Sequence, residues 1–231
     1  ILDQPRSRGI GDVYKRHADY DNEGDLDIAL SNYGAGVADK IFRNMWSEEG
    51  DEEFEEVWSE SPPQTVSVAW GDLDGDGDGD FALSKGGNTE LFMYDQTTGE
   101  IYSEATISTN RAEDLIWDDM DGDGDDDLVV IRHCCSALPN QTYYNNEGDF
   151  QLVWESAEAF NSLQGTIGDL DGDGLHDLVT VSSTDGAHLY LSTDGEDNLL
   201  PSTASWQSTQ GSNYKDVILS DVDADGDYDL V

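Results

Sequence analysis

The chain of 231 residues carries a formal net charge of −42, from 52 acidic and only 10 basic residues. Because nucleic-acid binding needs clustered Lys and Arg, this charge excludes nucleic acid as an expected partner, and it disfavours anionic membrane surfaces. No apolar run approaches the ~20 residues that span a bilayer, so we expect no membrane insertion by this segment. High charge is typical of disordered chains, but 6 Trp, 10 Tyr and 6 Phe favour a folded one.

Five acidic nonamers recur along the chain about once every fifty residues. Positions 1, 3 and 9 of the nonamer are Asp in every copy, and position 6 is always Gly. Position 5 is Asp in four copies and Glu23 in the first. A solvated acidic tract would not keep this register five times. In chain order the copies are 19–27 (DYDNEGDLD), 72–80 (DLDGDGDGD), 119–127 (DMDGDGDDD), 169–177 (DLDGDGLHD) and 221–229 (DVDADGDYD).

The spacing of the carboxylates within each nonamer predicts a calcium loop. Calcium takes about 6–8 oxygen ligands, and acids at alternate positions of a curled loop can converge on one ion. Glycine at position 6 permits the positive φ that a sharp turn needs. Leu175 at position 7 of the fourth copy has no side-chain oxygen, so we expect position 7 to ligate through its backbone carbonyl.

The candidate ligands are therefore positions 1, 3, 5, 7 and 9 of each copy, for up to five Ca²⁺ ions. They are Asp19, Asp21, Glu23, Asp25 and Asp27; Asp72, Asp74, Asp76, Asp78 and Asp80; Asp119, Asp121, Asp123, Asp125 and Asp127; Asp169, Asp171, Asp173, Leu175 and Asp177; and Asp221, Asp223, Asp225, Asp227 and Asp229.

Two other calcium motifs do not fit the nonamers. An EF-hand needs Glu at position 12, where the first four copies have Leu30, Leu83, Val130 and Thr180 and the fifth has no residue. Calcium β-rolls repeat their nonapeptides without gaps. What remains is a calcium loop that leads directly into an apolar strand.

Up to four short segments in each repeat predict β-strands. They are too short for helices and rich in β-branched and aromatic residues. In the order of the repeat, they are 66–70, 115–117 and 217–219 before the loop; 28–30, 81–83, 128–131, 178–181 and 230–231 after it; 41–42, 91–94, 143–144 and 189–191 in mid-repeat; and 54–58, 101–102, 150–154 and, less clearly, 199–200.

Four strands per repeat of about fifty residues is typical of a β-propeller blade. We predict an all-β protein in which residues 1–231 form a single repeat array. It would be an incomplete propeller arc of about four blades plus partial ends, cut from a longer protein. The alternative is a calcium-stabilised β-solenoid, which usually has shorter repeats.

The loops and the apolar runs behind them resemble FG-GAP repeats and the related VCBS repeats. Segments 42–44 (FRN) and 144–146 (YNN), each followed by an acidic Gly turn and an aromatic residue, are similar to the second half of a VCBS unit. The resemblance implies an integrin-α-like propeller with calcium bound by the loop positions given above. Glu23 departs from the family pattern, and the literal Phe-Gly and Gly-Ala-Pro signatures are mostly absent, so the VCBS form fits better.

The expected function is structural calcium binding in a non-catalytic module of an extracellular or cell-surface protein. Family analogy implies adhesion or binding of a protein or glycan ligand. The alternative is the propeller part of a secreted polysaccharide lyase or another carbohydrate-active enzyme. The sequence shows no catalytic motif, and the four His residues have no zinc spacing.

Two further residue types leave alternatives open. Cys134 and Cys135 are adjacent, so they form either two small strand residues or a strained vicinal disulfide. The six Trp residues are expected in the core, or else exposed as stacking platforms for sugars. They are Trp46, Trp58, Trp70, Trp117, Trp154 and Trp206.

Overall fold

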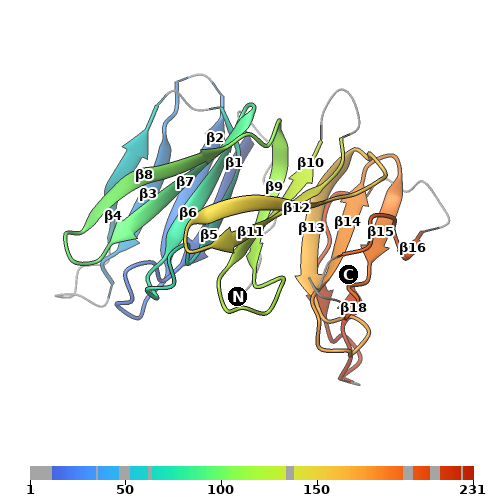
Figure 1. The fold of residues 1–231 in the computed structure, drawn as a ribbon. Coiled ribbons are helices and arrows are strands. Elements are labelled where there is room, and N and C mark those ends of the chain that lie inside the picture. Colours follow the sequence, from blue (N-terminus) through green and yellow to red (C-terminus); the bar gives the residue numbers. More distant parts are fainter. Residues whose placement is uncertain are drawn as a thin grey trace. The chain divides into compact units, whose positions relative to one another are not determined.

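The computed structural model describes residues 12–34, 36–46, 53–61, 64–133, 138–194, 200–208, 214–224 and 226–231. The regular elements within these ranges are all β-strands (Figure 1). No helix in them has the length and apolarity that a membrane span needs. The chain divides into two compact units, Ile1–Ala112 and Glu113–Val231.

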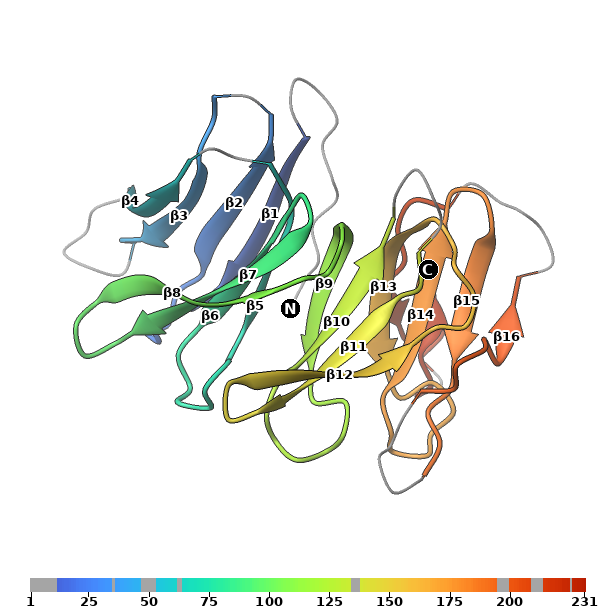
Figure 2. The ribbon, with the colours of Figure 1, turned by 45° about the horizontal axis from the view of Figure 1, so that its top comes forward.

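The first unit contains two four-stranded antiparallel sheets. Their strand orders are β1-β2-β3-β4 and β5-β6-β7-β8, so each sheet is a meander in which neighbours in sequence pair with each other (Figure 2). The strands are β1 (Asp12–Ala18), β2 (Asp27–Tyr33), β3 (Asp39–Asn44), β4 (Phe54–Glu60), β5 (Thr65–Gly71), β6 (Asp80–Lys85), β7 (Asn88–Asp95) and β8 (Glu100–Ile107).

Aromatic side chains fill the core between these two sheets. Phe81 and Phe92 stack with ring centroids 4.9 Å apart, and Trp58 packs edge-on against both rings. Trp70 also packs edge-on against Phe81, and Tyr20 stacks on Trp70. Burial of large apolar rings is the main favourable term in holding such sheets together. The second strand of each sheet, which follows the nonamer, contributes side chains to this core.

The second unit contains two four-stranded sheets and one two-stranded sheet. Their orders are β12-β11-β10-β9, β13-β14-β15-β16 and β17-β18. The strands are β9 (Ala112–Asp118), β10 (Asp127–Arg132), β11 (Gln141–Asn146), β12 (Asp149–Glu155), β13 (Ser162–Gly168), β14 (Asp177–Ser182), β15 (Gly186–Tyr190), β16 (Trp206–Gln207), β17 (Leu219–Ser220) and β18 (Asp229–Leu230).

The second strands β10 and β14 are the most buried elements of this unit. Every residue of each of these strands is buried, as expected for strands covered on both faces. Val129 and Ile131 share a core cluster with Leu178, Trp154 and Tyr190. In these two blades, the apolar run behind the nonamer is therefore the buried centre of the sheet.

The predicted fold class is confirmed: the protein is all-β, and its described residues form four four-stranded blades and a two-stranded partial one. One predicted strand was wrong: the fourth strand of the fourth blade is β16, and the predicted segment 199–200 is not that strand. Leu200 is buried in the core instead, and Leu199 lies outside the described residues, as do Cys134 and Cys135.

The expectation for the Trp residues is only partly confirmed. Trp154 is 5% exposed, and Trp58 and Trp70 pack against the core of the first unit. Trp46 and Trp206 are instead 61% and 50% exposed, because Trp46 follows the end of β3 and Trp206 begins a two-residue edge strand.

Candidate metal centres

Each nonamer connects the first strand of a blade to the second. In the first blade, β1 ends at Ala18, the loop runs from Asp19, and Asp27 is already the first residue of β2. Position 9 likewise opens β6, β10, β14 and β18. The loops are therefore held at both ends by paired strands, as the sequence predicted.

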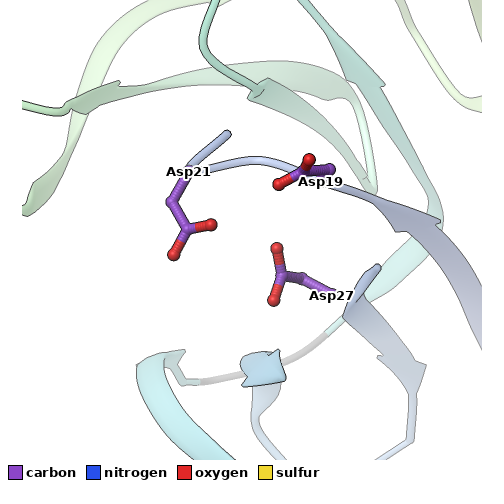
Figure 3. Close-up of side chains that lie close together, drawn as sticks. All are labelled: Asp19, Asp21 and Asp27. Atoms are coloured by element: carbon purple, nitrogen blue, oxygen red, sulfur yellow. The ribbon is translucent and has the colours of Figure 1, made fainter. Parts of the chain in front are cut away.

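The carboxylates at positions 1, 3 and 9 converge in every loop. In each triad one oxygen per residue lies within 4.8 Å of the others, and Figure 3 shows the three carboxylates of the first loop turned toward one another. This grouping fits a cation with several oxygen ligands. The triads are Asp19, Asp21 and Asp27; Asp72, Asp74 and Asp80; Asp119, Asp121 and Asp127; Asp169, Asp171 and Asp177; and Asp221, Asp223 and Asp229.

Backbone N–H groups orient the carboxylate at position 1. In all five loops it accepts a hydrogen bond from the N–H of the position-6 glycine, at 3.0–3.2 Å. That glycine has a φ between 88° and 102°, which confirms the predicted left-handed turn. Position 4 is also left-handed in every loop, a feature that the sequence analysis missed because Asn22 and Ala224 stand there in place of glycine.

Positions 3 and 5 form a ladder of short turns in the three middle loops. The position-3 carboxylate accepts from the N–H of position 5 at 3.1–3.3 Å. The position-5 carboxylate accepts in turn from the N–H of position 7 at 2.9–3.0 Å. These bonds hold the chain of each middle loop in a series of tight turns.

The carboxylate at position 9 ties the loop to the third strand of its blade. In Asp127, Oδ2 accepts from the N–H of Met120 at 2.9 Å and Oδ1 from the N–H of Asn145 at 2.8 Å. The same two bonds recur at the other complete blades. Position 9 thus anchors the fold in addition to joining the triad.

Burial makes these anchoring carboxylates costly to ionise without a partner cation. The position-9 side chains of the four complete blades are fully buried. Burial raises the pKa of Asp27 to about 6 and the pKa values of Asp80 and Asp127 to about 7, and it also raises the pKa of Asp177. A bound cation would offset this desolvation.

The side chains at positions 5 and 7 do not belong to the converging triads. Ligation by the position-7 carbonyl therefore stays a prediction, as does ligation by the position-5 side chains. Asp225 lies outside the described residues. Asp78 at position 7 is 4% exposed, and burial raises its pKa to about 7.

Neighbouring loops contact each other within each unit. In the first unit, the N–H of Gly79 donates to the carbonyl of Tyr20 at 2.7 Å. In the second unit, Nδ1 of His176, at position 8 of the fourth loop, lies 2.8 Å from Oδ2 of Asp118, directly before the third loop. Loops of adjacent blades therefore lie at the same edge of each unit.

A cation of the protein itself reaches the first loop, and the sequence analysis did not single it out. Arg43 on β3 lies with Nε 2.7 Å from Oδ2 of Asp21, and its Nη2 pairs with the carboxylate of Glu23. One sequence signal could have found it: when the third-strand segments are compared, the first has a basic residue where the other three have uncharged ones.

Comparison with protein families gives one match. A model described as an FG-GAP-like repeat matches residues 19–83, 119–180 and 169–231. Each matched segment begins at position 1 of one loop and includes all of the next loop, so the five loops are all covered. A search of curated proteins found no match.

Proposed function

The chain belongs to the FG-GAP-like repeat family, and we propose that it is a β-propeller repeat module whose acidic loops bind calcium. The observation that supports this most strongly is the convergence of three carboxylates in all five loops. Their oxygens are held by backbone N–H groups, so little ordering remains to be done when an ion binds.

Calcium is the cation that this donor set favours. The triads offer only carboxylate oxygens, which suit hard cations, whereas zinc and copper prefer nitrogen and sulfur ligands. Magnesium demands near-ideal octahedral geometry and keeps several waters. We propose weak, extracellular-type affinity, on the order of 10⁻⁴–10⁻³ M.

The proposed role of the ion is to fasten the first turn of each blade. Calcium at the triad would join the end of the first strand to the start of the second, and position 9 would pass that constraint to the third strand. If each of the five loops held one ion, the formal net charge would change from −42 to −32.

Calorimetric titration of the chain with calcium, magnesium and zinc tests this proposal. We expect calcium to bind at several sites and magnesium far more weakly. The variant Asp121→Asn, which changes one triad, should lose one calcium ion, whereas Asp149→Asn, an exposed carboxylate in the same sheet, should lose none. Absence of calcium binding at millimolar concentration would overturn the proposal.

We propose further that the module is non-catalytic and extracellular or attached to the cell surface, with a role in adhesion or ligand binding. Family membership supports this role, and millimolar extracellular calcium would fill weak sites. A protein and glycan array, screened with calcium and again with EDTA, tests it. Binding of a defined ligand only in calcium is the expected result, and no binding under either condition would contradict it.

The second candidate is the propeller part of a secreted polysaccharide lyase or another carbohydrate-active enzyme. The exposed Trp46 and Trp206 favour it, because sugars stack on exposed aromatic rings. Incubation of the chain with acidic polysaccharides distinguishes the two. Cleavage would establish the enzymatic reading, whereas binding that Trp206→Ala weakens without any cleavage would establish glycan recognition.

A further inference from the structure

The first loop differs from the others in how its acidic residues are neutralised. Oδ2 of Asp21, at position 3, lies 2.7 Å from Nε of Arg43, and Glu23, at position 5, pairs with Nη2 of the same guanidinium. The Asp21 side chain is 4% exposed and that of Arg43 is 24% exposed. One cation therefore already engages the two acidic positions that form the middle of the proposed ligand set.

The position of Arg43 can be compared across the four complete blades. In each blade, one N–H on the third strand or just after it donates to Oδ1 of the position-9 Asp, and Arg43 directly precedes that donor in the first blade. The corresponding residues are Met93, Tyr144 and Leu191 in the next three blades. None of these three carries a charge, so the basic residue is specific to the first blade.

A guanidinium and a calcium ion compete for the same oxygens. Arg stays protonated at any physiological pH, so it cannot leave the site by losing its charge. An ion held by Asp21 would lie close to the guanidinium, and two positive groups at that separation repel each other strongly in a partly buried site. Arg43 would have to leave both carboxylates before calcium could take the full ligand set.

We propose that Arg43 takes the place of calcium in the first loop, so that this loop stays free of metal at calcium concentrations that fill the others. The inference rests on the proposed calcium binding of the remaining loops. The sequence marked Glu23 as the departure of this loop from the family pattern. The geometry assigns the larger effect to Arg43. Glu23 contributes because its side chain, which is longer than that of Asp, pairs with the Arg43 guanidinium.

A loop held by arginine can support its neighbour without metal. Asn22 Nδ2 donates to the carbonyl of Gly77 in the second loop at 2.5 Å, and the N–H of Gly79 donates to the carbonyl of Tyr20. Gln96 Nε2 donates to the carbonyl of Asp21 at 3.1 Å. The first loop thus braces the second loop whether or not calcium is present.

Counting calcium ions by native mass spectrometry and calorimetry tests this inference. In the background Glu23→Asp, which restores the position-5 residue of the other loops, the ion count should equal that of the parent chain. Adding Arg43→Met, the residue found in the next blade, should raise the count by one. Adding Lys40→Met instead removes a charge from the same strand, where Lys40 pairs with Glu56, and should change nothing.

A second pair of variants keeps the test open if the double variant does not fold. In the otherwise unchanged chain, Asp19→Asn should leave the ion count as it is, whereas Asp72→Asn should lower it by one. Loss of one ion in Asp19→Asn, or equal counts with and without Arg43, would overturn the inference. No calcium bound by any variant would instead overturn the proposed function.

Discussion

Two residues in each loop have a left-handed backbone, and this conformation gives the most local test of the loop geometry. Gly77, at position 6 of the second loop, has a φ of 91°, and a Cβ atom there would meet nothing within 4 Å. Any effect of Gly77→Ala should therefore come from backbone strain alone, which is about 1–2 kcal/mol for an L-residue.

We expect Gly77→Ala to lower the free energy of unfolding by about that amount and to weaken calcium binding at its loop. Chemical denaturation in calcium measures the first effect and titration the second. Gly87→Ala is the matched control, because Gly87 also has open space around it but has no positive φ. Equal behaviour of the two variants would contradict the proposed role of the turn.

Position 4 shows what the same strain means where glycine is absent. Ala224 in the fifth loop has a φ of 61°, and Ala tolerates this region less well than Gly or Asn. Ala224→Gly should therefore strengthen calcium binding by the fifth loop, whereas Gly122→Ala should weaken it in the third loop. Titration of both variants checks the two directions.

His188 provides the pH dependence at the scale of a single residue. It is buried and stacks on Phe160 with ring centroids 3.7 Å apart. Burial lowers its pKa, against the opposing charges of Asp185 and Glu158. Because the folded state disfavours the protonated ring, the unfolded state binds more protons, and stability is lost as the pH falls below about 6.5.

The measurement for His188 is a comparison of unfolding free energies at pH 7.5 and 5.5 in saturating calcium. The parent chain should lose more stability over this range than His188→Phe, which keeps a ring against Phe160 but cannot take up a proton. An equal loss in both chains would contradict the assignment of this pH dependence to His188.

At the scale of the element, the position-9 Asp at the start of the second strand joins the loop to the third strand through one carboxylate. In Asp127→Asn, the amide could accept from only one of the N–H groups of Met120 and Asn145, and its NH₂ would face the other. Leaving one buried donor unsatisfied costs about 1–3 kcal/mol, and the triad also loses a charge. We expect a loss of stability of this size even in EDTA.

Unfolding of Asp127→Asn in EDTA separates the anchoring role from the metal role. The control is Asp149→Asn, which removes an exposed carboxylate from the same sheet and should leave stability unchanged within about 0.5 kcal/mol. If Asp127→Asn lost stability only in calcium, position 9 would be a ligand without an anchoring function.

Much of each blade could be predicted from its residues, and the exceptions have physical reasons. The second strands were found because 81–83 and 128–131 are short apolar runs placed directly behind a regular loop. The strand β16 was missed because Leu199 and Leu200 are more apolar than Trp206–Gln207. Leu200 is buried in the core, although it does not belong to a strand.

The residues of the candidate site could also be predicted only in part. Positions 1, 3 and 9 could be predicted because a fixed spacing within nine residues determines them. Arg43 was missed because it lies on another strand and is brought near the loop by the pairing of β2 with β3. The hydrogen bonds of position 9 to the third strand were missed for the same reason, since they join residues up to 18 apart in sequence.

At the scale of the whole molecule, the acidic composition and the loops belong to one account. A chain with a net charge of −42 repels itself, and many of its carboxylates lie in the loops, where several are also buried. Calcium would neutralise these clusters and connect strands within each blade. Ions that bind only the folded state stabilise it by RT ln(1 + [Ca²⁺]/Kd) per site, which is about 1.4 kcal/mol at a tenfold excess over Kd.

Thermal unfolding of the chain in millimolar calcium and in excess EDTA tests this account most directly. Several sites act together, and 1 kcal/mol corresponds to about 2–4 °C for domains of 150–250 residues, so we expect EDTA to lower Tm by about 10 °C or more. Added calcium should restore the original Tm, and magnesium should not. The same Tm in calcium and in EDTA would contradict the claim that these loops are calcium sites that hold the blades together.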